Sequence, residues 1–289
     1  MILGKCCHIR RETGCFLIFK LSVLTLNCRV EEKLELRVWG DPSLPALVYL
    51  PGLHGDWTII GALRAALAGH VRFVEMNYPR TLTWSLDDYA SAIEEELAKA
   101  GITDGWLLGE SFGSQPMWRL IARDKFHTQG AVLAGGFVRY PWQPFLRTLE
   151  KWTGGLLSFL FVEVIFGWAR VARYRYRDPH VLATLDEFLA RRREPMDHKA
   201  AQHRLQLVGE SDARTTAMTT QIPIFGLAGV IDPIVPWPHV RRWLKRYCPT
   251  LRDYRIIRHA DHNVLNTGTK ESAKWILEWM QVAKAVVNV

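Results

Sequence analysis

The pattern of apolar and polar positions along the chain alternates between two periods. Short apolar runs, typical of buried strands, are separated by segments in which apolar residues recur every three or four positions, as on amphipathic helices. The predicted strands cover 34–40, 46–50, 71–76, 106–108, 131–138, 222–230 and 254–259. The predicted helices cover 57–69, 85–101, 114–123, 238–248 and 270–286. This alternation predicts an α/β fold with a mostly parallel central sheet and helices on both faces.

The N-terminal residues 1–28 are compatible with two interpretations. A basic stretch followed by CFLIFKLSVLTL is similar to a signal sequence, but Lys20 interrupts the apolar run and no Ala-x-Ala cleavage site follows. The run is also too short to span a bilayer. Because apolar and polar residues alternate over 21–30, the segment suits a strand. We therefore expect 1–28 to be an N-terminal extension or first strand, and the protein to be cytoplasmic.

One interval is too long for a simple crossover between strands. Residues 139–221 separate two predicted strands, whereas a crossover needs only about 10–15 residues. The interval has a helical pattern and many aromatic residues, so we expect a helical cap, or lid, over the carboxyl ends of the strands. It divides the core into 29–138 and 222–289, and we expect 142–168 to line one side of a pocket at that edge of the sheet. The aromatic residues concerned are Trp142, Phe145, Trp152, Phe159, Phe161, Phe166 and Trp168.

The segment LLGESFGSQPMW (107–118) places Ser111 between two glycines, after an apolar strand and before a predicted helix. A serine that attacks an acyl carbon must stand on a tight strand-to-helix turn, and small flanking residues let that turn close. The amides at the start of the following helix also favour an anion that forms there. A helix-capping serine is the alternative, but we favour a nucleophile.

A nucleophilic serine requires two partners, a histidine base and a carboxylate that orients the base. Asp232 and His262 each follow a predicted strand, so both are expected at the sheet edge where Ser111 lies. For Asp232 the alternative is a turn aspartate before a proline. His259, which we expect still on its strand, is the alternative base.

The order of nucleophile turn, acid and histidine, with an insert before the acid, resembles the α/β-hydrolase family over roughly residues 30–289. The resemblance implies a serine hydrolase that cleaves an ester or related acyl bond through an acyl-enzyme, with Ser111 as nucleophile, His262 as base and Asp232 as acid. It implies no cofactor, no metal and an apolar small-molecule acyl substrate. An acyltransferase, a carbon–carbon bond hydrolase and a non-catalytic ligand-binding member of the fold remain alternatives.

The family also uses a backbone amide after its third strand, usually near a His-Gly pair, to hold the oxyanion. Here the corresponding segment is YLPGLHGDW (49–57). If its Pro-Gly pair replaces His-Gly, the donor is the amide of Leu53; if its own His-Gly pair is the match, the donor is the amide of Asp56. We prefer Leu53, which is closer to the strand end, with the amide of Phe112 as second donor. His54 is expected to line the pocket or to bond its loop.

Composition and charge restrict the partners. The net charge of +8 predicts a basic surface, but no nucleic-acid motif accompanies the arginines, so we expect no nucleic-acid partner. The five cysteines form no C-x-x-C pair and indicate a reducing compartment. Adjacent Cys6, Cys7 and His8 are poor chelators, and we expect no metal there.

The segment LLSFLFVEVIFGWA (156–169) is apolar nearly all round and is followed by several arginines. Such a helix can lie on an anionic membrane surface, so peripheral membrane contact through the cap is one expectation. The alternative, which we prefer, is a lid helix buried over the acyl pocket.

Overall fold

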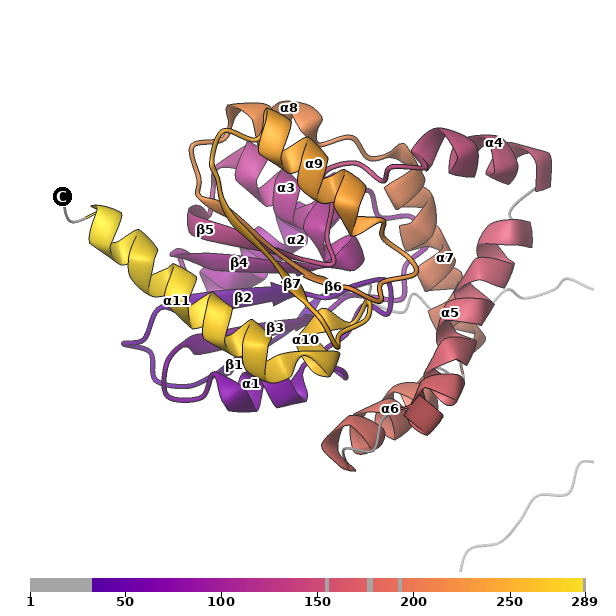
Figure 1. Ribbon diagram of the computed structural model, residues 1–289, viewed down its shortest axis with the longest axis horizontal. Helices are drawn as coiled ribbons and strands as arrows, with labels where there is room; N and C mark the ends of the chain where they lie inside the picture. Colours follow the sequence, from indigo (N-terminus) through magenta and orange to yellow (C-terminus); the bar gives the residue numbers. More distant parts are fainter. Residues whose placement is uncertain (1–32, 154–155, 176–178, 192–193, 288–289) are drawn as a thin grey trace, which may run out of the picture. The chain divides into compact units, whose positions relative to one another are not determined.

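The computed structural model describes residues 33–153, 156–175, 179–191 and 194–287. Within these residues the strands are β1 (Glu35–Trp39), β2 (Ala46–Leu50), β3 (Arg72–Asn77), β4 (Asp104–Glu110), β5 (His127–Ala134), β6 (Ile224–Gly229) and β7 (Leu251–Ile257). They form one sheet in the order β1-β3-β2-β4-β5-β6-β7 (Figure 1). Only β1 pairs antiparallel; the other neighbours are parallel. The mostly parallel sheet is therefore confirmed.

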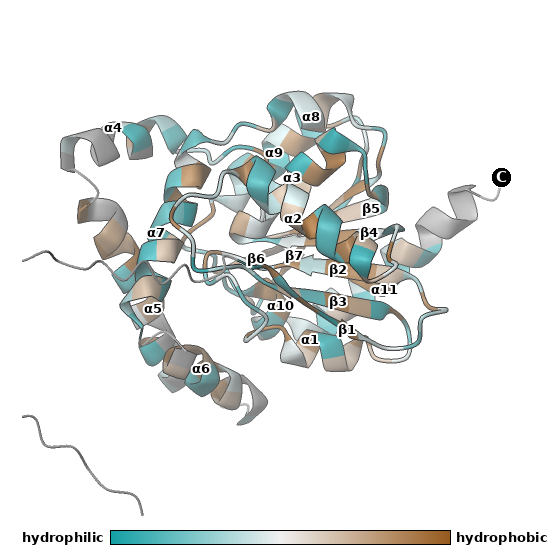
Figure 2. Cartoon of the chain, turned by 180° about the vertical axis from the view of Figure 1, so that it is seen from behind, coloured by the Kyte–Doolittle hydropathy of each residue, from teal (hydrophilic) through white to brown (hydrophobic). Residues whose placement is uncertain are grey.

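Helices cover both faces of this sheet (Figure 1). On one face α2 (Leu86–Lys99), α3 (Ser114–Arg123) and α9 (Trp237–Tyr247) contribute to a large apolar core. On the other face α1 (Gly61–Ala66), α10 (Val264–Thr267) and α11 (Thr269–Val287) form a second core. Hydrophobic residues run through the sheet between these layers (Figure 2).

The central strands and helix α2 form for reasons that are visible in their sequences. All five residues of β2 are buried, as expected of a parallel strand covered on both faces and built from a continuous apolar run. Helix α2 begins with a reciprocal capping box in which Ser85 and Asp88 each accept the other's backbone amide. Such a cap typically contributes about 1 kcal/mol to helix stability.

The interval between β5 and β6 contains five helices among its described residues. They are α4 (Gln143–Thr153), α5 (Leu156–Arg175), α6 (Pro179–Arg191), α7 (Pro195–Glu210) and α8 (Arg214–Thr219). Side chains of α5, α6 and α7 form a small apolar cluster that includes Ile59 of the core. Helix α8 instead packs against α3. No described helix is long and apolar enough to cross a membrane, and this includes α5.

Several element boundaries differ from the prediction. Helix α1 is shorter than the predicted 57–69. Strand β5 ends at Ala134 instead of 138, because Gly135 adopts a φ of +57° and turns the chain. Strand β7 ends at Ile257, two residues before the prediction. The N-terminal extension or first strand expected in 1–28 lies outside the described residues.

Candidate active site

Ser111 lies at the strand-to-helix turn that the sequence indicates. Strand β4 ends at Glu110, a short 3-10 turn covers Ser111–Gly113, and α3 begins at Ser114. Ser111 has a φ of +49°, which is uncommon for a residue with a side chain. Such strained backbone persists where the surrounding structure holds it, and it is common at active sites.

Two glycines make this turn possible. A Cβ atom added at Gly109 would lie 2.9 Å from the Cα atom of Ser114, and one at Gly113 would collide with the carbonyl oxygen of Leu50. Side chains at either position would therefore push α3 away from β4 or β2. The small residues on both sides of Ser111 are required by this close packing.

The structure brings Ser111, His262 and Asp232 together in one hydrogen-bonded chain. The Nε2 atom of His262 lies 2.9 Å from the Ser111 hydroxyl, and its Nδ1 atom lies 2.9 Å from a carboxylate oxygen of Asp232. An ionised carboxylate can only accept, so Nδ1 donates to Asp232 and Nε2 accepts from Ser111. This is the tautomer in which a histidine can remove the serine proton.

The Asp232 carboxylate is held by its own loop. Its side chain is fully buried, and one oxygen accepts the backbone amides of Ile234 and Val235 at 2.8 and 2.9 Å. The other oxygen is left for His262. These bonds hold the carboxylate in place and so restrict the orientation of the histidine ring that bonds to it.

The charges around His262 change its pKa. Burial alone would lower the pKa, but the charge and hydrogen bond of Asp232, together with Glu110 and Asp261, raise it above the ordinary value. These groups therefore stabilise the imidazolium form relative to a histidine in water. A base that becomes positively charged as it takes the serine proton benefits from the same negative groups.

His259 does not lie where the prediction placed it. It is exposed in the turn after β7 and is not on the strand. The reason is that the chain leaves the sheet at Ile257. Residues 258 and 259, predicted as the end of the strand, therefore belong to the turn that follows it. The structure thus joins His262, and not His259, to Ser111.

The segment after β2 lies directly against the nucleophile. A Cβ atom added at Gly52 would be 3.5 Å from the Cβ atom of Ser111. Leu53, Ser111 and Phe112 line the same pocket. Asp56 is not among that pocket's lining residues; its carboxylate accepts the amide of Thr58 instead. This arrangement favours the register in which the Leu53 amide is the oxyanion donor.

The pocket next to Ser111 is narrow and apolar. Its volume of about 20 Å³ is enough for about one water molecule. Phe137 and Tyr140 come from the segment that follows β5, Ile234 from the loop after β6, and Phe161, Leu205 and Val208 from helices α5 and α7. A long acyl chain therefore requires that these walls move apart.

The expectation that 142–168 lines this pocket is wrong for most of the aromatic residues. Trp142, Phe145, Trp152 and Phe159 are 41–85% exposed. Phe161 lines the pocket, and Phe166 packs in the cluster with α6 and α7. The other residues of the inserted helices that line the pocket, Leu205 and Val208, belong to α7, outside that stretch. The side chain of Trp168 lies outside the described residues.

A buried carboxyl group that the sequence analysis missed belongs to Glu110, the residue directly before Ser111. Glu110 is 2% exposed and accepts a hydrogen bond from the Tyr49 hydroxyl. Burial raises the pKa of Glu110 to about 7. The Tyr49 hydroxyl also lies 3.5 Å from Nε2 of His54, so His54 contacts strand β2 and not its own loop through this atom. The sequence signal that could have identified Glu110 is the presence of a charged residue inside the apolar run WLLGESFG.

A buried arginine from α7 holds the segment after β2, which includes Leu53. Arg204 is 2% exposed, and its guanidinium donates to the carbonyls of Leu53 at 2.9 Å and Pro79 at 3.1 Å. Its Nε atom lies 3.4 Å from the Tyr89 hydroxyl. The carbonyl of Leu53 is thereby fixed by a cation from the inserted helices. Nothing in the local sequence distinguishes this arginine from the many exposed ones.

The described residues contain no group of three His, Cys, Asp or Glu side chains that could hold a metal ion.

Comparison with solved structures supports the fold. A structure from a study of carboxylesterases of the thaumarchaeon Nitrososphaera gargenis has a TM-score of 0.68 and 14% sequence identity. The match covers 87% of this chain and 95% of that one. The enol-lactonase of Burkholderia xenovorans has a TM-score of 0.66 and 18% sequence identity, and the match covers 86% of this chain and 96% of that one. A thermophilic esterase of Thermogutta terrifontis has a TM-score of 0.68 and 18% sequence identity, and the match covers 86% of this chain and 93% of that one. At these identities the likeness shows the fold alone.

The comparison with family models shows to which family the chain is related. No curated protein matches the chain. The family model described as "Serine aminopeptidase, S33" matches residues 75–268, which is more than half of the 289 residues. The matched range includes Ser111, Asp232 and His262. The chain therefore belongs to the serine aminopeptidase S33 family of α/β-hydrolases and is a hydrolase of the α/β fold.

Proposed function

We propose that the protein hydrolyses a carboxylic ester or related acyl bond of an apolar small molecule through a covalent acyl-enzyme. The observation that carries this proposal is the hydrogen-bonded chain from Ser111 through His262 to Asp232, with 2.9 Å at both links. Its position beside a narrow apolar pocket supports an uncharged acyl group as the part of the substrate that binds there.

In the first half-reaction, the Ser111 oxygen bonds to the carbonyl carbon while Nε2 of His262 takes the hydroxyl proton. The amides of Leu53 and Phe112 hold the negative oxygen of the tetrahedral intermediate. The bond to the leaving group then breaks, and the imidazolium returns its proton to the departing alcohol. Asp232 orients the ring and stabilises its positive charge throughout.

In the second half-reaction, water takes the place of the alcohol. His262 removes a proton from that water, whose oxygen attacks the acyl carbon, and the same two amides hold the oxyanion. When the bond to Ser111 breaks, the serine oxygen recovers a proton and the free acid leaves. An acyltransferase differs only in the nucleophile that enters at this step.

Fluorophosphonate labelling combined with a panel of p-nitrophenyl esters of increasing chain length tests the proposal. We expect the probe to label Ser111, and Ser111→Ala to lose labelling and turnover while it remains folded. Ser91→Ala, an exposed serine on α2, is the matched control and should keep both. Equal labelling of the Ser111→Ala variant would refute the assignment. Aminoacyl anilides and added alcohols in the same panel separate amide hydrolysis and acyl transfer from ester hydrolysis.

A further inference from the structure

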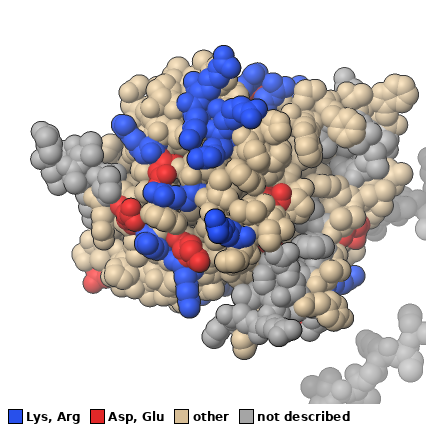
Figure 3. Space-filling model, in the orientation of Figure 1, with Lys and Arg blue, Asp and Glu red and all other residues tan. Residues whose placement is uncertain are grey.

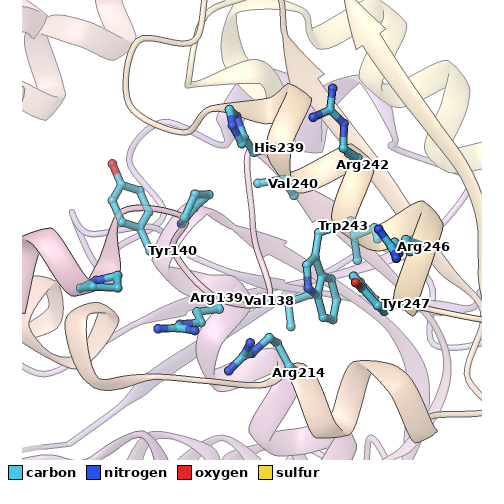
Figure 4. A pocket seen from close by; sticks show the side chains of 13 residues that line it. Val138, Arg139, Tyr140, Arg214, His239, Val240, Arg242, Trp243, Arg246 and Tyr247 are labelled. Atoms are coloured by element: carbon cyan, nitrogen blue, oxygen red, sulfur yellow. The ribbon is translucent and has the colours of Figure 1, made fainter.

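A second and larger cavity lies beside α9. Its volume is about 360 Å³, within the usual range for small-molecule sites. It is lined by residues that follow β5, by Arg214 of α8 and by one face of α9 (Figure 4). Neither Ser111, Asp232 nor His262 lines it. Tyr140 lines both cavities, and its hydroxyl donates to the carbonyl of Ile234 at 2.8 Å.

The rim of this cavity is strongly cationic. Arg139, Arg214, Arg242 and Arg246 line it, and none of its described lining residues is an aspartate or glutamate. Lys and Arg side chains gather on the surface over this part of the molecule (Figure 3). The rim therefore attracts anions.

Not all of this charge is compensated within the protein. Asp212 binds Arg214 through both carboxylate oxygens, at 2.9 and 2.7 Å, and lies 3.9 Å from Arg139. Arg242 and Arg246, by contrast, form no ion pair with any residue that the structure describes. Arg242 is exposed, and the Arg246 guanidinium lies over the Tyr247 ring, 5.2 Å from its centroid, so no described carboxylate neutralises either charge.

The floor between the arginines is aromatic and aliphatic. Trp243 and Tyr247 come from successive turns of α9, with ring centroids 5.3 Å apart, and Val240 and Leu244 line the cavity beside them. Figure 4 shows the two rings between Arg214 on one side and Arg242 on the other. An inorganic anion would leave this floor unused, and a neutral apolar molecule would leave the arginines unused.

We propose that this cavity binds an organic phosphate with a planar apolar body. Guanidinium groups match the geometry of phosphate oxygens and bind them in a bidentate manner. Arg242 and Arg246 bind the phosphate, and the planar part of the ligand stacks on Trp243. The site differs from the acyl pocket in charge, and Tyr140 is the one described residue that lines both.

Calorimetric titration of the full chain with phenyl phosphate tests this proposal, with Ser111 first blocked by a phosphonate so that the acyl pocket is not the binding site. Phenyl phosphate should bind at least about tenfold more tightly than inorganic phosphate or phenol. Arg242→Gln should weaken binding by about tenfold or more. Lys245→Gln is the matched control, because it removes one charge from the same helix without lining the cavity, and it should bind like the parent. Trp243→Ala should remove the preference for phenyl phosphate over inorganic phosphate.

Four results would overturn the proposal. These are the absence of binding at millimolar phenyl phosphate, equal affinity for inorganic phosphate, equal weakening by Arg242→Gln and Lys245→Gln, and binding only to phosphatidic acid vesicles. The last result would assign the arginines to a lipid headgroup instead of a soluble ligand. Arg242 and Lys245 are both exposed, so their variants test the site even if Trp243→Ala fails to fold.

Discussion

At the scale of single residues, the two histidines near the end of β7 give a direct comparison. His262 is bonded to both Ser111 and Asp232, whereas His259 is exposed in the preceding turn. We expect His262→Ala to reduce turnover by at least about 10³-fold, because among the residues that the structure describes only His262 is hydrogen-bonded to the Ser111 hydroxyl. His259→Ala should leave kcat unchanged. A larger loss for His259→Ala, measured with a p-nitrophenyl ester, would show that the wrong histidine has been chosen.

Glu110 provides a second test at this scale through the pH dependence of the reaction. His262 must be neutral to accept a proton, and the negative charge of Glu110 contributes to its raised pKa. Glu110→Gln keeps a hydrogen-bond acceptor for Tyr49 but removes that charge. The acid limb of the kcat/KM profile should therefore move to lower pH in this variant. A limb that stays in place, in a variant that folds normally, would show that the charge of Glu110 does not influence His262.

Residues differ in how far the sequence predicts their roles. The position of Ser111 in the hydrogen-bonded chain is predictable because its motif, strand and helix are contiguous, and the positions of Asp232 and His262 because each follows a strand of the same sheet. Glu110 and Arg204 were missed because charged residues are rarely buried. Their partners are a tyrosine 61 positions away and a carbonyl 151 positions away. No local pattern contains that information.

At the scale of elements, the pocket walls on α5 and α7 should set the acyl-chain preference. Each methylene that becomes buried contributes about 0.8 kcal/mol, or about fourfold in kcat/KM, until the walls stop the chain. Phe161→Ala should move the optimum to longer esters. Val164→Ala, on the same helix but 69% exposed, should keep the parent profile. The same shift in both variants would indicate that the helix, and not the wall, determines the preference.

The outer face of α5 carries a second prediction. Leu160, Val164 and Val171 are 45–69% exposed on this helix, and exposed Arg170 lies among them. Peripheral contact with anionic membranes therefore stays a prediction, and co-sedimentation with vesicles that contain phosphatidylserine checks it. Val164→Asp should reduce sedimentation, whereas Met218→Asp on α8 should not. Protein that remains in the supernatant with these vesicles would contradict the prediction.

The apolar pattern of α5 also explains why the sequence analysis did not predict which side chains of this helix are buried. Because the helix is apolar nearly all round, its sequence does not indicate which face is buried. The structure buries Val162 and Phe166 and exposes Leu160 and Val164. In α2, by contrast, one face is clearly apolar and the helix lies where the pattern placed it. Amphipathic helices and fully apolar strands were therefore predictable, whereas the contacts of α5 depended on tertiary structure.

At the scale of the whole molecule, the buried carboxyl of Glu110 should make stability depend on pH. Its pKa rises from 4.5 to about 7 on burial, so the folded protein holds a proton that the unfolded chain releases. This contribution to stability is complete below the unfolded pKa and is lost as pH increases to about 7. Glu110→Gln should therefore gain on the order of 1–3 kcal/mol relative to the parent above that pH and little below 4.5.

Urea unfolding of the parent and of Glu110→Gln across this pH range measures the difference. Glu95→Gln, an exposed carboxylate on α2, is the control for removal of one charge. A stability difference between the parent and Glu110→Gln that does not change with pH would show that the buried carboxyl titrates alike in the folded and unfolded states.

The buried position of Arg204 limits how substrates can enter and how the insertion can vary among relatives. If α7 moved outward as part of a rigid lid, the guanidinium would lose the carbonyls of Leu53 and Pro79, and the segment after β2 would lose its support. We therefore expect α7 to remain attached to the core when a substrate enters. The other inserted helices are tied to α7 in turn, because Arg147 of α4 donates to the carbonyls of Gly209 and Glu210 and side chains of α5 and α6 pack in one cluster with α7. Specificity can diverge through α4 to α6 only by changes that keep these contacts.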